Sequence, residues 1–310
     1  MTADPADVTA KTRPLRAALV ANAMLSAGSA VALLVASDYW RTLFPVPANG
    51  WPQALVLGLL VFAFDLIHQA TRRRMQSGRA LLSSLADLLW VAASIALLLS
   101  APAWLAPAAG MVVLWIALAV LGLGLWQLYG IHHLHWNRLT RRYRHCLQVA
   151  VTMPAARLWP VLADLGDIAR YMPSLRRSEV IGGQLPGIGA MRECEDLRGR
   201  RWREVCTAFE PERGFTVTFV TDADGFPYPA TTMEGGWQLE PVGSATVVRV
   251  WWELRPRPMW MSTLLLPVLA WQADRRFPAV VAAMARAAGD EQPTNPDTSD
   301  RPPRLLPNLC

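Results

Sequence analysis

Four long apolar stretches in the first 131 residues constrain the fold of this chain more than any other feature. Each is close to the ~20 residues that an α-helix needs to cross the ~30 Å hydrocarbon core of a bilayer. None carries the polar stripe of a helix on the surface of a soluble protein. We therefore expect a polar tail at 1–15 and a four-helix transmembrane domain at 16–131. The four stretches are residues 16–37, 52–70, 80–101 and 109–131.

Basic residues are distributed unevenly among the segments that join these stretches. They lie before the first stretch, between the second and third, and after the fourth, whereas the other two connections contain only Arg41. Because positive charge is retained on the cytoplasmic side, we expect both termini in the cytoplasm and the protein in a bacterial inner membrane. Trp40, Trp51 and Trp104 lie at the opposite helix ends, as an outer aromatic belt would. A cleaved signal peptide is the alternative for the first stretch, although its apolar run is longer than a signal usually has.

The net charge of +6 is also local. Residues 1–144 hold 12 Lys or Arg and 5 Asp or Glu, whereas residues 145–289 hold 16 and 15. The C-terminal part is therefore nearly neutral, and the basic excess flanks the membrane helices. A nucleic-acid partner is not expected, because such partners require a basic surface on the globular part.

From Cys146 onward the apolar spacing alternates, as in strands. A strand is expected from Cys146, and two short helices follow Pro154. A long helix should then run from about Pro258 to Ala288, with breaks or kinks at Pro267 and Pro278. Between them, six strands are expected at 176–183, 189–197, 201–210, 213–221, 232–241 and 244–255.

This order predicts an α+β domain at 146–288, in which a curved antiparallel sheet wraps the long C-terminal helix. A basic juxtamembrane linker at 132–145 would join it to the helical bundle. Residues 289–310 are rich in Pro, Asp, Thr and Asn, and are expected to form a disordered tail.

The α+β region contains four segments in a specific order: ARLWPVLADLGDIARYMPSL, VIGGQLPGIGAMRECEDLRGRRWREVCTAFEP, GFPYPATTMEGGWQLEP and ATVVRVWWELRPRP. They resemble the SRPBCC superfamily, which has the START-related helix-grip fold, and within it the polyketide cyclase/dehydrase and lipid-transport branch. The segments FDLIHQATRRR and ADLLWVAASIALLL are similar to a four-helix membrane domain of bacterial proteins, a similarity that brings no activity with it.

The resemblance implies a cavity for a hydrophobic ligand between the sheet and the long helix. Filling a core is the alternative interpretation of each residue expected to line it. These residues are Trp159, Tyr171, Met172, Phe215, Val217, Phe219, Trp237, Leu239, Val250 and Trp252.

Groups that carry acid–base chemistry are scarce in this domain. Its only histidine is His145, at the very edge, and no Ser-His-Asp, Cys-His or metal set can be assembled from residues 146–310. Glu193, Glu195 and Glu204 lie on expected strands, and one of them buried in the cavity could act as a base. A solvated strand face beside arginines is the alternative. No cofactor is expected.

A polar cluster is expected near the cytoplasmic mouth of the helical bundle. Asp65 and His68 share one helix face, Asp87 lies at a similar depth on the next helix, and His132 ends the fourth. Ionisable residues inside a membrane suggest a proton or metal site. The alternative, in which they reach out to the interface, is favoured, so no metal is assigned.

The turn near residue 199 carries several arginines together with a tryptophan. Such a turn could dock onto the anionic headgroups of the cytoplasmic leaflet, and a solvated turn is the alternative. Its residues are Arg198, Arg200, Arg201, Trp202 and Arg203.

Together these features favour a membrane-tethered module that binds or transfers a hydrophobic ligand, such as a lipid, a quinone or a polyketide-like molecule. A cyclase or dehydratase acting on a membrane-soluble substrate is the second interpretation. A structural or regulatory membrane protein without a ligand is the third. A polar group deep in the interior would favour the enzyme, an entirely apolar interior the carrier, and a filled core the third. The sequence names neither the ligand nor the oligomeric state.

Overall fold

The chain folds into two units, which are described separately. A computed structural model describes residues 5–45, 50–100, 105–223, 225–290 and 304–306. The first unit is Pro5–Leu134, and the second begins at His135.

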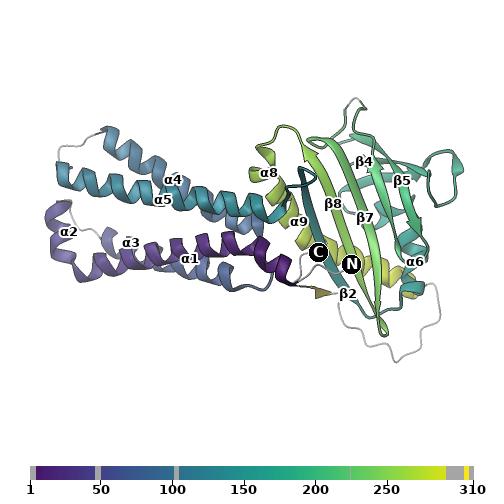
Figure 1. Cartoon of the computed structure of the whole chain (residues 1–310), viewed down its shortest axis with the longest axis horizontal. Helices are drawn as coiled ribbons and strands as arrows, with labels where there is room; N and C mark the ends of the chain where they lie inside the picture. The colour runs from purple at the N-terminus through teal and green to yellow at the C-terminus, as the bar shows by residue number, and fades with distance from the viewer. Residues whose placement is uncertain (1–4, 46–49, 101–104, 224, 291–303, 307–310) are drawn as a thin grey trace. The chain divides into compact units, whose positions relative to one another are not determined.

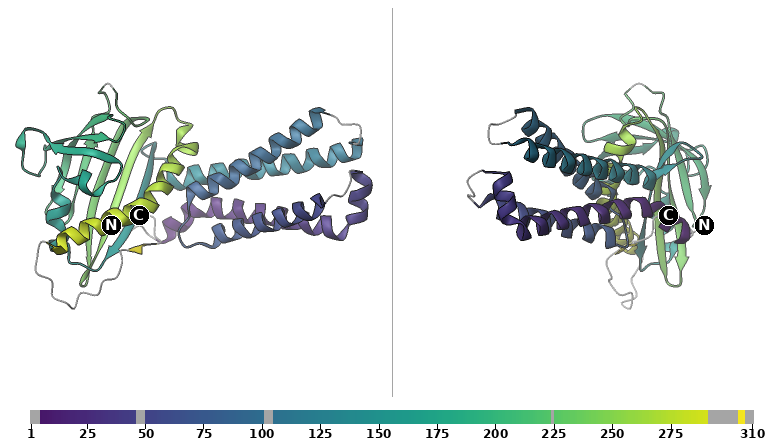
Figure 2. Two further views of the ribbon diagram at one scale, coloured as in Figure 1. Left: turned by 180° about the vertical axis from the view of Figure 1, so that it is seen from behind. Right: turned by 60° about the vertical axis from the view of Figure 1, so that its left-hand side comes forward.

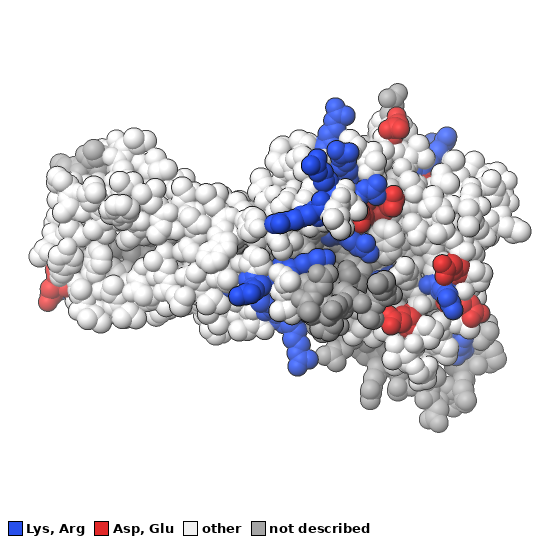
Figure 3. Space-filling view, viewed as in Figure 1, with Lys and Arg blue, Asp and Glu red and all other residues white. Residues whose placement is uncertain are grey.

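The first unit is entirely helical (Figure 1). Four of its helices are long and apolar enough to cross a membrane, which confirms the predicted number of spans. Val35, Phe64, Leu89 and Leu99 are each more than 70% exposed on them, as side chains facing lipid would be. In Figure 3 the helices show almost no charged atoms along most of their visible face. The helices are α1 (Pro5–Val35), α2 (Ser37–Leu43), α3 (Trp51–Thr71), α4 (Ser77–Ser100) and α5 (Pro107–His135).

Helix α1 begins earlier than the expected boundary at residue 16. Thr12 and Leu15 are already buried, at 5% and 0% exposure. A Cβ placed on Gly130 of α5 would lie 2.7 Å from the Cα of Leu15. The absence of that Cβ therefore allows the start of α1 to pack closely against α5, and this contact stabilises the polar part of the helix.

The second unit contains one curved antiparallel sheet, with α9 packed across one face (Figures 1 and 2). The strand order is β1-β2-β8-β7-β6-β5-β4-β3, and β9 also pairs with β2. The strands are β1 (Trp136–Asn137), β2 (Arg142–Val151), β3 (Leu175–Val180), β4 (Met191–Asp196), β5 (Arg201–Glu210), β6 (Gly214–Phe219), β7 (Ala230–Val242), β8 (Ala245–Pro256) and β9 (Arg304–Leu305). The helices are α6 (Ala155–Ala163), α7 (Ile168–Tyr171), η1 (Ile181–Gly183), α8 (Met261–Leu264) and α9 (Leu266–Asp290). The predicted α+β layout, a sheet around a long C-terminal helix, is confirmed.

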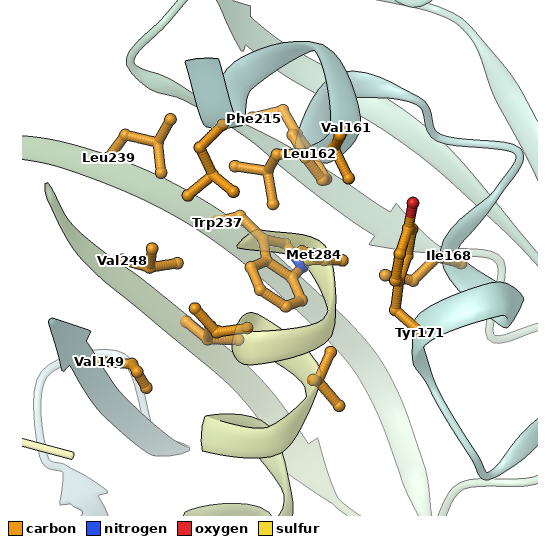
Figure 4. Close-up of a cluster of buried hydrophobic side chains, with 14 of the residues drawn as sticks. Val149, Val161, Leu162, Ile168, Tyr171, Phe215, Trp237, Leu239, Val248 and Met284 are labelled. Atoms are coloured by element: carbon orange, nitrogen blue, oxygen red, sulfur yellow. The ribbon is translucent and has the colours of Figure 1, made fainter. Parts of the chain in front are cut away.

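Alternate side chains of the strands form the core of this unit. Val149 on β2, Val248 on β8 and Leu239 on β7 are at most 5% exposed and belong to one cluster. Met284 of α9 faces them, and Ile168 of α7 belongs to the same cluster (Figure 4). The period of two along each strand thus separates an inner face that packs on α9 from an outer face.

The strand expected to begin at Cys146 begins at Arg142, inside the segment predicted to be a linker. A two-residue strand, β1, precedes it and places Trp136 opposite Tyr143. Tyr143 and His145 are 1% and 2% exposed, whereas Arg144 between them points outward. The basic residues of this segment, which resemble those flanking a membrane helix, therefore occupy outward positions of a strand. Tyr143 and His145 occupy its inward positions.

The long C-terminal helix is broken next to Pro267, as predicted, and continues through Pro278. Helices α8 and α9 meet at Leu265, and Pro267 is the second residue of α9, where a missing N–H leaves no hydrogen bond unmade. Pro278 lies inside α9. Most of the expected C-terminal tail, and Trp104 of the expected aromatic belt, lie outside the described residues.

Candidate functional site

All ten residues expected to line a ligand space lie in one apolar cluster inside the second unit. Tyr171, Phe215, Val217, Trp237, Leu239 and Val250 are 4–8% exposed, and Trp159, Met172, Phe219 and Trp252 pack against them while partly buried. A ligand-lined wall and a packed core share this composition. Their role as lining residues therefore stays a prediction.

Aromatic rings connect the sheet to α9 within this cluster. The ring of Phe277 on α9 lies 5.7 Å from that of Trp237 and 6.4 Å from that of Trp252. The Trp159 ring on α6 lies 5.2 Å from the ring of Phe209. Flat aromatic side chains contribute large apolar areas with few rotatable bonds.

One charged pair is buried on the inner face of β4 and β5, where Arg192 lies directly opposite Glu204. Their side chains are only 8% and 4% exposed. The Arg192 Nε donates to Glu204 Oε2 at 2.7 Å, and its Nη1 donates to the Leu165 carbonyl at 3.3 Å. The Trp202 indole donates to Glu204 Oε1 at 2.7 Å. Both oxygens of the buried carboxylate are therefore bonded, which a stable buried ion pair requires.

Burial and the charges of this pair shift the pKa values of Arg192 and of nearby side chains. Burial lowers the pKa of Arg192, but the charge of Glu204, its hydrogen bond and the neighbouring thiols Cys194 and Cys206 together outweigh this effect and raise it. Burial, and then the charge of Glu204, raise the pKa of Cys194 to about 11, and the same two causes raise that of Tyr228. Cys194 and Cys206 are both buried free thiols.

The three glutamates singled out from the sequence have different surroundings. Only Glu204 faces the interior, and Arg192 and Trp202 occupy its oxygens. Glu193 and Glu195 pair with Arg203 and Arg201, both at 3.0 Å, through arginine side chains that are more than half exposed. Glu204 thus has the burial expected of a base but lacks an available oxygen.

A second buried polar pair links the sheet to α9. The His145 Nε2 lies 3.0 Å from Asp274 Oδ1, with side chains 2% and 9% exposed. The His145 ring also lies 4.5 Å from Trp252 and 5.3 Å from His135. The sequence analysis placed His145 at the very edge of the domain, whereas the structure buries it beside a carboxylate 129 residues further along the chain.

The sequence contains a weak indication that Asp274 lies on the buried face of its helix. Ala270, Asp274 and Val281 follow helical spacing along α9, and Ala270 and Val281 are buried in the apolar interior. A carboxylate at an apolar position of an amphipathic helix requires a polar partner on the element it packs against. Only the strand register identifies that partner as His145.

The arginine turn is largely neutralised by neighbouring carboxylates. Arg200 pairs with Asp196 at 2.7 Å, in addition to the pairs of Arg201 and Arg203 described above. Trp202 is 5% exposed and faces the interior, so it is not part of the exposed turn. Lipid docking by Arg198, Arg200, Arg201 and Arg203 stays a prediction.

The polar residues of the helical unit form separate contacts. Asp87 is 4% exposed and accepts hydrogen bonds from Asn22 at 2.7 Å and Gln127 at 2.8 Å. Asp65 instead accepts from Gln69 at 2.6 Å and pairs with Arg79. These bonds join α1, α4 and α5 at one point and α3 to α4 at another, as polar side chains do inside membranes.

His68, another member of the expected cluster, has a different partner. His68 accepts a hydrogen bond from Arg72 at 3.1 Å on an exposed face. Among the described residues, no group of three or more His, Cys, Asp or Glu side chains has a geometry that could hold a metal ion.

Residues 146–289 match the family model described as polyketide cyclase/dehydrase and lipid transport. This match bears out, for the C-terminal domain, the resemblance to the polyketide cyclase/dehydrase and lipid-transport branch. A search of curated proteins found no match.

Solved structures resemble the same half of the chain. The crystal structure of Ara h 8.0201 is 14% identical, covers 47% of this chain and 99% of its own, and has a TM-score of 0.38. The Zhui aromatase/cyclase from Streptomyces sp. R1128 is 18% identical, covers 48% of this chain and 95% of its own, with a TM-score of 0.38. The protein XoxI from Bacillus cereus is 15% identical, with coverages of 49% and 99% and a TM-score of 0.38.

Proposed function

We propose that this protein binds a hydrophobic ligand, of the lipid, quinone or polyketide-like class, inside its C-terminal domain and exchanges it with the membrane. The observation that carries the proposal is the continuous apolar interior between the inner sheet face and α9. It lies in a domain that matches a family described by polyketide cyclisation and lipid transport. Apolar ligands partition into bilayers, so a domain tethered to a membrane lies beside their source.

The proposal places the helices in a bacterial inner membrane, with both termini and the C-terminal domain in the cytoplasm. The alternation of basic residues between connecting segments supports this orientation. Reporter fusions after Pro45 and at the C-terminus test it. We expect the first reporter outside and the second inside, and an external C-terminus would contradict the orientation.

The domain also follows the last apolar helix without an intervening linker. Helix α5 ends at His135, and β1 begins at Trp136. Trp136 packs against a small apolar cluster around Leu266, the first residue of α9. Met259 and Trp260, which precede Leu266 in the sequence, are 51% and 59% exposed. This end of the domain thus combines the exit of the last helix with exposed apolar side chains, which supports contact with lipid.

Ligand transfer can be measured with the full chain in lipid nanodiscs and a fluorescent lipid supplied from vesicles. The Val217→Trp substitution fills the interior and should reduce uptake at least tenfold. Thr207→Trp is the matched control, because it adds the same ring at an exposed strand position. Mass spectrometry of molecules that co-purify with the wild type then identifies the ligand class. The proposal fails if no apolar probe binds the wild type, and the interior is then simply a core.

A cyclase or dehydratase is the second candidate, because His145 and Asp274 place an acid–base pair beside the apolar interior. A carrier returns its ligand unchanged, a dehydratase releases a product lighter by one water, and a cyclase that loses no water releases an isomer of equal mass. Incubating the purified chain with its co-purified ligand class and measuring both the mass and the chromatographic retention of the product separates these functions.

A further inference from the structure

The His145–Asp274 pair lies where two apolar clusters meet. Along the inner face of β2, Leu147 belongs to the large cluster, and Tyr143 belongs to a smaller one with Leu254 and Leu266. His145 lies between them, opposite Trp252 of β8. The interior therefore changes from apolar to polar at one defined position.

The hydroxyl of Tyr143 gives this position a further donor. Tyr143 is 1% exposed, its ring stacks on His135 at 4.8 Å, and among the described residues its hydroxyl has no hydrogen-bond partner. A buried hydroxyl without a partner is energetically unfavourable. Native structures rarely retain such a group unless a ligand or water completes it.

The surroundings keep this hydroxyl protonated. Burial and then the negative charge of Asp274 raise the pKa of Tyr143 well above its ordinary value. The phenol therefore remains a donor at neutral pH and can bond an oxygen acceptor that enters the site.

We propose that Tyr143, together with the His145–Asp274 pair, binds a single hydrogen-bonding oxygen at one end of an otherwise apolar ligand. The inference rests on the proposed function and narrows its ligand to neutral molecules with a hydroxyl, phenol or carbonyl group. The apolar part of the ligand would contact the large cluster around Val217 and Trp237.

The negative charge of Asp274 limits which ligands can bind at this site. A ligand carboxylate or phosphate would face the acidic side chain of Asp274, and bringing two negative charges into a buried site is unfavourable. A pure hydrocarbon would leave the Tyr143 hydroxyl without a partner. A neutral oxygen avoids both costs.

The test uses matched pairs of probes that differ by one oxygen: 2-naphthol with 2-methylnaphthalene, and 1-dodecanol with n-tridecane. Binding to the full chain in nanodiscs is measured against empty nanodiscs, which correct for partition into lipid. Wild-type protein should prefer the oxygen-bearing member of at least one pair by about tenfold, the equivalent of one hydrogen bond of about 1.4 kcal/mol.

Two variants locate the preference. Tyr143→Phe keeps the ring that stacks on His135 and removes only the hydroxyl, so it should abolish the preference while leaving hydrocarbon binding unchanged. Tyr228→Phe is the control, because it removes a tyrosine hydroxyl from the loop before β7, where the ring packs on Trp202 and Phe219, and it should retain the preference.

The outcomes separate this inference from the proposed function. Binding of both probe types without preference, or a preference that survives in Tyr143→Phe, overturns the oxygen site and leaves the hydrophobic ligand standing. Failure of every probe to bind the wild type overturns both. Unchanged thermal unfolding of Tyr143→Phe shows that its effect is not a loss of fold.

Discussion

The two buried polar pairs of the C-terminal domain differ in how completely their groups are bonded. Arg192 and Glu204 lie on neighbouring strands, and Trp202 and a backbone carbonyl complete their hydrogen bonds. The His145–Asp274 pair joins the sheet to α9 beside the Tyr143 hydroxyl, which has no bonding partner among the described residues.

This difference leads us to propose a structural role for the first pair and a ligand-binding role for the second. A completed network makes the fold rigid and leaves no group for a ligand. A site with an unpaired hydrogen-bond donor is less stable, but that donor remains available to bind a ligand. We therefore expect substitutions in the first pair to affect folding and substitutions around the second to affect ligand preference.

The largest effect is expected for Glu204→Leu. It leaves the Arg192 charge buried without a partner and should destabilise the domain by about 3–5 kcal/mol. Urea unfolding of the full chain in mild detergent measures this loss. The unfolded fraction of the domain at each urea concentration is detected by its proteolysis. Replacing Arg192 by Met and Glu204 by Leu together should restore most of the stability. Glu193→Leu, at an outward position, should change it by less than about 0.5 kcal/mol. Equal losses in all three would contradict the comparison.

A smaller loss is expected for Asp274→Ala. Histidine can remain neutral when its acidic partner is removed, whereas arginine cannot. The cost is therefore one lost hydrogen bond and an unsatisfied donor, about 1–3 kcal/mol. The same urea experiment measures it, and a loss as large as that of Glu204→Leu would show that both pairs are structural.

Alkaline pH should weaken the region of the Arg192–Glu204 pair. The folded state raises the pKa of Cys194 to about 11 from its ordinary value of 9.0, chiefly through burial. Between these values the folded thiol keeps a proton that the unfolded thiol has released. Stability is thus fully present below pH 9 and falls by up to about 1.4 kcal/mol per pH unit as the pH rises toward 11.

The Cys194→Ala variant isolates this effect, because it removes the titrating group and keeps a small apolar side chain. Its unfolding free energy should fall less steeply between pH 9 and pH 11 than that of the wild type. Parallel curves for the two proteins would assign the alkaline loss to other groups, such as Tyr228.

The smallest effect on stability is expected for Tyr143→Phe. Its buried hydroxyl makes no hydrogen bond among the described residues, so removing it should cost no stability and should leave the unfolding free energy equal or slightly higher. Trp202→Phe is the corresponding change in the completed network. It removes a bond to a charged carboxylate and should cost about 1.5–3 kcal/mol. Thermal unfolding of both variants makes the comparison directly.

The amino-acid sequence by itself determined the helical spans, the order of the strands and the long C-terminal helix. These features depend on local properties: the length of an apolar run, a period of two in strands such as β6, and prolines such as Pro267. It also placed residues such as Val217 and Trp237 on the inner face, because alternation along a strand assigns faces without knowledge of the partner strand.

Only the tertiary structure decided which polar groups meet. Glu193, Glu195 and Glu204 look alike in the sequence, and the faces of β4 and β5 separate the buried one from the exposed two. His145 looked like part of a basic linker, and only the structure shows that β2 already begins at Arg142, so that the alternation along β2 turns His145 inward. Its contact with Asp274 depends on the position and rotation of α9 against the sheet. Such contacts join segments far apart in the chain, and no local pattern specifies them.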